Sequence, residues 1–312
     1  MSEYALYNAP QSTCSQRVRY VLHAKGRTFE EHKLDLFRGD QLKPEYLAIN
    51  PNGLVPALVH QGAAVIDSSV IMEYLEDVVA DFAPLRPRDP LAVARMRAMM
   101  RYIDEVPTPA VRVPSYNLAF LPHYQAMTEE EFLAVCESKP LRREFLMKMG
   151  RTGFPQSEMD EALARLRRGI DRMARWLNES GGPWLMGDDL SLADIAIMPV
   201  IVRMDDINLG RLWADAPEIA AWLDRIRATE AFPKTYYHGS LLTEKISTSP
   251  GLEGSGRLNA GKRQEKQDAT RNSRAETHRN RRRRDADRLG RDVTDVEPAA
   301  QAIDGVDGPS SP

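Results

Sequence analysis

Residues 50–77 read NPNGLVPALVHQGAAVIDSSVIMEYLED, and this stretch decides the fold. Two short apolar runs flank Gln61 and Gly62, a pattern that predicts a β-hairpin. A helix is expected from Asp67 onward, because an acidic side chain at a helix start accepts hydrogen bonds from free backbone N–H groups. The first turn of such a helix also attracts anions through its oriented amides.

Val55 and Pro56 stand immediately before the first strand of this hairpin. A proline lacks the N–H that a sheet ladder uses, so this position needs a sheet edge or a special turn. A trans proline in a loop is the ordinary interpretation, since only about 5–6% of X–Pro bonds are cis. A cis bond would turn the backbone N–H and C=O of Val55 outward, where they could pair with an extended peptide.

The order G-x-V-P-A-L, hairpin, D-S-x-x-I-x-x-Y-L resembles the glutathione-binding half of the glutathione transferase superfamily. The resemblance implies that Val55 and Pro56 form a cis pair that binds the cysteinyl backbone of glutathione. It also implies that Asp67 and Ser68 hold the γ-glutamyl end. Leu54 departs from the family, because many transferases have a polar residue there for the glycyl carboxylate. The glycyl end is therefore left without an evident partner.

The composition is typical of a soluble chain with a sizeable core: 28% of the residues are charged, 42% are hydrophobic and the net charge is −3. Two cysteines favour a reducing compartment over a disulfide scaffold. The first residues lack a secretion signal, and no run approaches the roughly 18 apolar residues of a membrane span. We therefore expect a cytoplasmic location and no membrane association.

Four segments are expected along the chain. Residues 1–82 follow the order β-α-β-α-β-β-α, which predicts an α/β thioredoxin-like N-terminal domain. A proline-rich linker at 83–90 leads to an all-α C-terminal domain at 91–243, which would bind the acceptor substrate. Residues 244–312 have the composition of a disordered, Arg-rich tail. Its basic cluster at 278–284 could bind nucleic acid, but a solvated tail is the favoured interpretation.

The helical segment carries its clearest periodicity at 157–178, where apolar residues repeat at intervals of three and four. Ser191 and Asp194 have the spacing of a capping box at the start of a nearly all-apolar, buried helix. This stretch also resembles the folding motif of the transferase family, which implies a structural role for Asp194. A last helix is expected at 222–232.

The loop before the first helix carries the candidate chemistry. Glutathione must ionise to attack an electrophile, and a free thiol titrates near a pKa of ~8.5. A hydroxyl that donates to the sulfur stabilises the thiolate, and Ser12, Thr13 or Ser15 could supply it. Without the surrounding pattern, a plain helix cap is the interpretation for Ser12. Asn8, at the end of the first strand, is a second polar group that could reach the sulfur, whereas Tyr7 is expected to pack.

The order S-x-C-S-x-x-x-R from Ser12 resembles the serine and cysteine classes of the family, especially the zeta class and the related bacterial reductive dehalogenases. That resemblance makes Ser12 the activating hydroxyl. It makes Cys14 the cysteine that forms a mixed disulfide with glutathione in the dehalogenases. A buried, inert thiol is the alternative for Cys14.

The segment 106–156 is longer than a minimal two-domain transferase needs, and with R-x-G-F-P-Q at 151–156 it resembles the bacterial β-etherase group. That group uses glutathione to cleave aryl ethers, although its members do not generally carry the S-x-C-S motif. Candidate walls of the acceptor pocket are Tyr102, Arg112, Tyr116, Phe120, His123 and Tyr124.

The resemblance thus implies an enzyme, a glutathione transferase that attacks an electrophilic small molecule, with an aromatic one favoured. β-Aryl ether cleavage or reductive dehalogenation is favoured; the alternatives are a maleylacetoacetate-type isomerase and a non-enzymatic protein that binds glutathione or a hydrophobic ligand. Glutathione is expected as co-substrate and no metal is expected. The resemblance also implies a homodimer, with Arg95, Arg101 and the apolar face near 96–100 as contacts.

Overall fold

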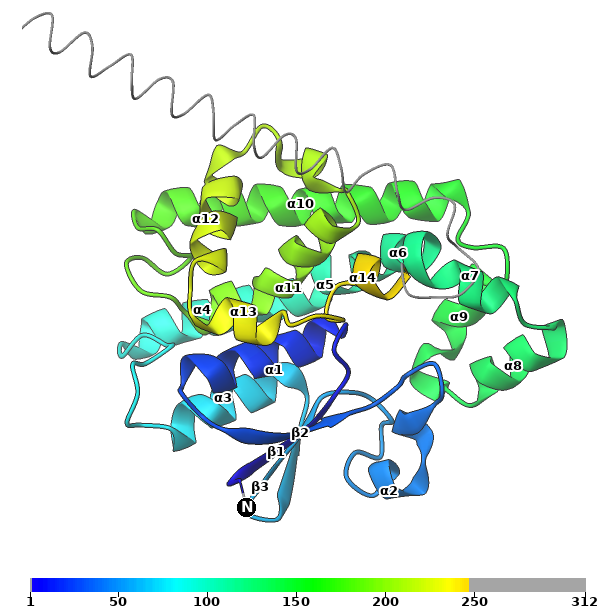
Figure 1. Ribbon diagram of the computed structural model, residues 1–312. Helices are drawn as coiled ribbons and strands as arrows, with labels where there is room; N and C mark the ends of the chain where they lie inside the picture. The colour runs from blue at the N-terminus through cyan, green and yellow to red at the C-terminus, as the bar shows by residue number, and fades with distance from the viewer. Residues whose placement is uncertain (1, 247–312) are drawn as a thin grey trace, which may run out of the picture. The chain divides into compact units, whose positions relative to one another are not determined.

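A four-stranded sheet forms the N-terminal half of the computed structural model, which describes residues 2–246 (Figure 1). The strand order is β2-β1-β3-β4; β1 is parallel to β2, and β3 is antiparallel to both β1 and β4. The predicted tail with its basic cluster lies outside the described residues, apart from 244–246. The strands are β1 (Tyr4–Asn8), β2 (Phe29–Lys33), β3 (Ala57–His60) and β4 (Ala63–Ile66).

The predicted hairpin is present between β3 and β4. Gln61 and Gly62 both have positive φ angles, 51° and 80°. A two-residue turn with both residues in this region matches the twist of antiparallel strands, and glycine adopts it without a steric penalty. The alternation of side chains along β1 places Tyr4 and Leu6 in the main core and Tyr7 on the opposite face.

Helices cover both faces of this sheet. α1 (Thr13–Ala24) and α3 (Ser68–Val78) lie between the sheet and the helical half of the chain (Figure 1). The short η1 (Asp40–Leu42) and α2 (Pro44–Leu47) lie on the other side, where Tyr46 packs 6.0 Å from the Tyr7 ring. This arrangement is the predicted thioredoxin-like layout.

The chain becomes helical from Pro90 onward, as predicted. Helix α10 contains the whole of the 157–178 prediction. The predicted helix at 222–232 is wrong in its bounds, because the chain breaks between α12 and α13. The elements are α4 (Pro90–Glu105), α5 (Pro107–Ala110), α6 (Arg112–Ser115), the π-helical η2 (Tyr116–Phe120), α7 (Leu121–Gln125), α8 (Glu129–Glu137), η3 (Pro140–Arg142), α9 (Arg143–Met149), α10 (Gln156–Ser180), α11 (Leu192–Asp206), η4 (Gly210–Trp213), α12 (Pro217–Arg227), α13 (Ala231–Thr235) and α14 (Leu242–Ile246).

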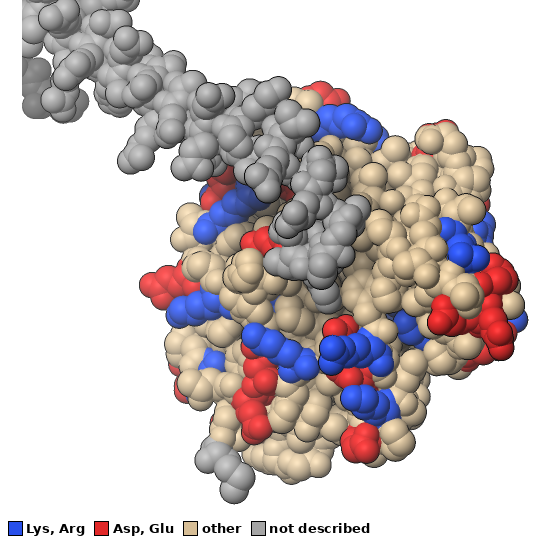
Figure 2. Space-filling model, turned by 45° about the vertical axis from the view of Figure 1, so that its right-hand side comes forward, with Lys and Arg blue, Asp and Glu red and all other residues tan. Residues whose placement is uncertain are grey.

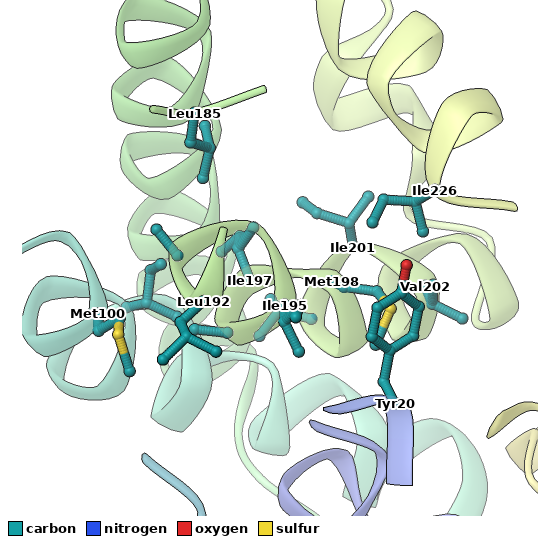
Figure 3. Close-up of a cluster of buried hydrophobic side chains, with 14 of the residues drawn as sticks. Tyr20, Met100, Leu185, Leu192, Ile195, Ile197, Met198, Ile201, Val202 and Ile226 are labelled. Carbon is teal, nitrogen blue, oxygen red and sulfur yellow. The ribbon is translucent and has the colours of Figure 1, made fainter. Parts of the chain in front are cut away.

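Helix α11 lies at the centre of the main core and is buried along almost its whole length. Figure 3 shows Ile195, Met198 and Ile201 of this helix among side chains from α1, α4 and α12. The helix begins with the predicted capping box: Asp194 accepts from Ser191 and also from the Leu185 N–H and the Trp222 indole, at 3.0 and 2.8 Å. Burial raises the pKa of this carboxyl from its ordinary value. Its contacts are those of a structural residue.

The segment α7–α9 has a small core of its own. Tyr124, Phe132, Cys136, Leu146 and Met149 are buried together there. In Figure 1 this segment extends from the bundle on the side where α2 lies. It therefore provides a wall that faces the N-terminal half.

A buried ion pair ties the end of α1 to the connection between the two halves. The Lys25 ammonium lies 2.7 Å from Glu76, and both side chains are almost completely buried. Glu76 also accepts from the Leu85 N–H, and Lys25 donates to the Ala83 carbonyl at 3.2 Å. The connection is thus fixed on both sides, and residues 2–246 belong to one compact unit.

The face of α4 that was expected to meet a partner subunit is part of the core instead. Met96 and Met100 are buried, at 0% and 3% exposure, and pack in the main cluster. Arg95 and Arg101 do lie on the surface. Val70 of α3 also lies on the surface, with 55% of its area exposed. No helix within residues 2–246 is long and apolar enough to cross a membrane.

Candidate active site

Ser12 caps the first helix. Its hydroxyl oxygen accepts from the Ser15 N–H at 3.3 Å, so the capping alternative for this residue is realised. Within the described residues the Ser12 hydroxyl donates to no acceptor, which leaves its hydrogen available to a ligand. No acidic residue stands in the first turn of α1, so the positive end of the helix dipole is not neutralised.

The loop that leads to Ser12 is held by residues far away in the sequence. Arg203 of α11 donates to the Gln11 carbonyl, and Gln16 donates to the Ser240 carbonyl at 3.0 Å. Arg19 donates to the Pro10 carbonyl at 2.7 Å and also to a carbonyl of α13. Because these side chains are buried, the position of the loop depends on the helical half of the chain.

The Asn8 side chain points away from the site beside Ser12 where a bound thiol is expected. Its side chain is fully buried and is occupied on both ends, by Arg19 at 2.5 Å and Glu31 at 3.2 Å. Asn8 is therefore removed from the candidate residues for a bound thiol. Tyr7 packs as expected, with its ring stacked on His32 at 4.3 Å.

The Val55–Pro56 peptide bond is cis, as the family resemblance implies. Neither the N–H nor the C=O of Val55 has a hydrogen-bond partner within residues 2–246. The preceding carbonyl, that of Leu54, points inward and accepts from the Tyr46 hydroxyl and from the Asn50 amide at 2.7 Å. These two inward bonds hold the segment so that the Val55 backbone remains free.

Asp67 and Ser68 open α3 beside this segment. Asp67 is the N-cap, and its carboxylate accepts from the Ser69 and Val70 N–H groups at 2.9 and 3.2 Å. Ser68 is buried, with its hydroxyl 3.4 Å from the guanidinium of Arg17. The start of the helix is thus tied to α1.

Arg17 connects the start of α3 to the helical half. Its guanidinium binds Asp104 of α4 at 2.5 Å, Thr108 at 3.0 Å and the Ala196 carbonyl at 2.8 Å. Asp104 in turn accepts from the Ser69 hydroxyl at 2.5 Å. One buried guanidinium therefore fixes three helices around the end of α3 that carries the candidate ligand groups.

A single cavity of about 380 Å³ brings the remaining predicted residues together. Ser12 and Cys14 line it from α1, Val55 and Pro56 from the loop before β3, and Asp67 and Ser68 from the start of α3; the volume is in the range of small-molecule sites. Cys14 is a free, half-buried thiol, so it is not the fully buried cysteine of the alternative interpretation.

The opposite wall of the cavity comes from the helical half. Four of the six expected wall residues line it: Arg112, Tyr116, Phe120 and Tyr124. Tyr102 and His123 do not. Tyr102 packs edge-on against Trp176 at 5.6 Å in the core, and the His123 ring packs against Phe37 at 4.3 Å.

Several cavity residues were not found from the sequence. Lys139 and Arg142 at η3, Arg203 of α11 and Gln41 of η1 all line the cavity. The only signal for the first two was their place in the long segment 106–156, and charge alone does not distinguish a cavity residue from a surface one. Within residues 2–246 no group of three or more His, Cys, Asp or Glu is placed to hold a metal ion.

Family models for the glutathione S-transferase N-terminal and C-terminal domains match residues 11–78 and 160–225. Protein LigF of Sphingobium sp. strain SYK-6 is 31% identical over 240 residues, which cover 74% of this chain and 92% of that protein. The chain belongs to the glutathione S-transferase family. It is accordingly a glutathione-dependent transferase.

Other relatives span several branches of this family. Glutathione S-transferase 1 of Dianthus caryophyllus is 30% identical over 63% of this chain and 75% of its own length. Maleylacetoacetate isomerase of Mus musculus is 27% identical over 64% of this chain and 77% of its own length. Among solved structures, the β-etherase LigF superposes with a TM-score of 0.68 at 30% identity, covering 75% of this transferase and 98% of LigF.

Proposed function

We propose that this transferase cleaves β-aryl ethers with glutathione. The observation that carries the proposal is the cavity itself. In it, the residues that the family resemblance assigns to glutathione face a wall of aromatic side chains from the segment after α4. The similarity to LigF, a β-etherase by its structure's description, covers 75% of this chain and supports the same reaction class.

The proposed pose of glutathione follows the free polar groups. Its γ-glutamyl end meets Asp67 and Ser68, and its cysteinyl backbone pairs with the unpartnered N–H and C=O of Val55. Its glycyl end extends toward Gln41, whose buried side-chain oxygen has no partner within the described residues and can accept from the glycyl N–H. This pose brings the sulfur to the first turn of α1.

In the proposed reaction the Ser12 hydroxyl donates to the sulfur and stabilises the thiolate. The thiolate attacks the carbon that carries the aryloxy group, a C–S bond forms and the C–O bond breaks. The phenolate leaves and takes a proton from water. The thiol proton passes to solvent when glutathione ionises, so the products are a thioether and a phenol.

A chromogenic ether tests this reaction. We propose 2-(4-methylumbelliferyloxy)acetophenone, which releases a fluorescent phenol when its ether bond is cleaved. Ser12→Ala should lower kcat/KM by roughly 10²–10³, the range for removing one donor to a reacting anion. Cys14→Ala should stay within a few-fold of the parent. Fluorescence release in the absence of a thioether product would contradict the proposal.

A second candidate uses Cys14, because this free thiol lines the same cavity. In reductive dehalogenation the Cys14 thiolate would attack the sulfur of a glutathionyl arene, and the arene carbanion would leave and be protonated. The resulting mixed disulfide would be resolved by a second glutathione. Loss of activity toward a halohydroquinone in Cys14→Ala alone, with a glutathione adduct on Cys14 by mass spectrometry, would favour it.

Two further outcomes are covered by the same panel. Turnover of a maleylacetoacetate analogue without ether cleavage would indicate an isomerase. Tight glutathione binding without any turnover would indicate a binding protein.

We also propose a homodimer whose contacts include the exposed Val70, Leu91 and Arg95 of α3 and α4. Light scattering would then give twice the chain mass of 35.2 kDa.

A further inference from the structure

The wall that faces the glutathione-type residues is rich in cations. Arg112, Lys139, Arg142 and Arg203 line the cavity from the helical half. Among the described lining residues the one carboxylate is that of Asp67, on the opposite wall, and it is bonded to the backbone at the start of α3. The helical wall therefore carries positive charge that no acidic side chain of the cavity balances.

Three of these cations are unpaired, in contrast to their neighbours in the sequence. Arg143 binds Glu137 at 2.7 Å, Lys148 binds Glu158 at 2.6 Å and Arg151 lies 3.5 Å from Glu129. Figure 2 shows the same mixing on the face turned to the viewer, where blue and red side chains lie next to one another. The unpaired cations are thus a feature of the cavity and not of the segment as a whole.

The unpaired side chains are Arg112, Lys139 and Arg142, none of which has a carboxylate or a side-chain hydrogen bond within residues 2–246. Arg203 differs from them, because its guanidinium is bonded to the Gln11 carbonyl and lies 3.4 Å from the Ser115 hydroxyl. Arg203 therefore holds the loop, and the other three are available to a ligand.

Holding these cations together is unfavourable without a counter-ion. Burial lowers the pKa of the Arg112 guanidinium, and the nearby Arg142 lowers it further. Burial also lowers the pKa of the Lys139 ammonium. Desolvated cations that repel each other are stabilised by a bound anion, and a planar guanidinium binds a carboxylate through two parallel hydrogen bonds.

We propose that the acceptor substrate is an aromatic carboxylate, held at its carboxylate by Arg112 and Arg142 while its ring packs on the aromatic wall. Tyr116 and Phe120 supply that wall, with ring centroids 4.8 Å apart in an edge-to-face arrangement. The inference rests on the proposed function, because it names the class of molecule that the glutathione thiolate attacks. A neutral aryl ether would leave both guanidinium groups without a counter-ion.

A matched pair of aryl chlorides tests the inference: 4-chloro-3,5-dinitrobenzoate and the neutral 4-chloro-3,5-dinitrobenzamide. With either probe the glutathione thiolate forms a C–S bond, chloride leaves and the thiol proton passes to the buffer. Each kcat/KM is divided by the uncatalysed rate constant of the same probe, which removes the difference in intrinsic reactivity. We expect the normalised value to be at least about tenfold higher for the carboxylate, as for a charge-assisted pair worth more than ~1.4 kcal/mol.

Variants locate the effect. Arg112→Met and Arg142→Met should each lower the normalised kcat/KM for the carboxylate far more than that for the amide, and should leave KM for glutathione unchanged. Arg143→Met is the control, because Arg143 is adjacent in sequence but paired with Glu137 on the surface. Equal normalised rates for the two probes, or an equal loss for both probes in the variants, would overturn the inference. A rise only in KM for glutathione would assign these cations to glutathione instead.

A binding measurement separates this inference from the reaction. If the protein turns over neither probe, the proposed transferase chemistry fails with these acceptors, and calorimetry with 4-phenoxybenzoate and 4-phenoxybenzamide decides the inference. In the presence of S-methylglutathione the carboxylate should bind at least about tenfold more tightly than the amide. Arg112→Met should remove that difference. Equal affinities would refute the anion site whatever the reaction is.

Discussion

Replacing Arg17 by methionine should weaken both the fold and glutathione binding. Methionine preserves the length and the apolar part of the side chain but removes every hydrogen bond of the guanidinium. The Ala196 carbonyl and the Thr108 hydroxyl then each lose a buried, charged donor, at about 1–3 kcal/mol each. Asp104 loses its ion pair, although its side chain is 30% exposed and retains contact with solvent.

These losses sum to roughly 3–5 kcal/mol, the usual cost of breaking a buried ion pair from one side. For a unit of this size each kcal/mol lowers Tm by about 2–4 °C, so Arg17→Met should melt roughly 6–20 °C below the parent. Urea unfolding followed by tryptophan fluorescence gives the free energy. The KM for glutathione should rise several-fold, because Ser68 loses the group that fixes its position.

Arg101→Met is the matched control. Arg101 lies on the same helix as Asp104, its side chain is 78% exposed, and its ion pair with Glu105 is of the surface kind worth about 0.3–0.5 kcal/mol. If Arg17→Met destabilises the protein by no more than about 1 kcal/mol beyond this control, the buried network does not hold the halves together as described. An unchanged KM for glutathione in Arg17→Met would show that Ser68 does not depend on it.

Three other predictions concern stability. Lys25→Met should cost about 3–5 kcal/mol in urea unfolding, because Glu76 is left charged and unpaired in the interior, and adding Glu76→Gln should recover part of the loss. Gly153→Ala should melt clearly below Gly181→Ala: both glycines have positive φ, but only at Gly153 would the new methyl carbon meet a leucine methyl at 2.9 Å and an amide oxygen at 3.0 Å. Burial raises the pKa of Tyr46 to about 12, above the ordinary value of 10.0, so its neutral form stabilises the fold fully below pH 10 and that contribution is lost as pH rises toward 12. Tyr46→Phe should therefore lose less stability than the parent between pH 10 and 12, and parallel curves would contradict this.

The N-terminal half was predictable because its signals are local. The cis Val55–Pro56 bond was expected only from the family resemblance, because local chemistry favours trans. The Gln61-Gly62 turn and the cap at Asp67, in contrast, each depend on neighbouring residues. The same holds for the capping box of α11. Local chemistry at these positions determines the backbone almost without reference to the rest of the chain.

The assignments that failed depend on long-range packing. Met96 and Met100 form an apolar stripe that fits a core or a partner equally well, and only the position of α11 decides for the core. Tyr102 and Asn8 lie close in sequence to residues that line the cavity. The Tyr102 ring nevertheless packs against Trp176, and the Asn8 amide accepts from Arg19, so neither side chain enters the cavity. Periodicity gives the face of a helix and not the element that the face meets.

The group of unpaired cations in the cavity could not be predicted for a related reason. Arg112 belongs to α6, whereas Lys139 and Arg142 lie at η3, in a segment interrupted by prolines. Their side chains converge because the small core around Phe132 and Leu146 sets the angle between those helices. Nearby arginines of the same segment face solvent, and the sequence does not separate the two groups.

The anchoring of the Ser12 loop by Arg203 and by the Ser240 carbonyl bears on how members of this family exchange parts. A chimera that joins residues 1–82 of this chain to the helical half of a relative would inherit the motifs but not the groups that set their position. Such a hybrid could fold and still hold Ser12 away from the position that it has in the cavity of this chain. Recombination between relatives should therefore give active enzymes only where the residues of the helical half that contact the Ser12 loop are transferred together with the loop.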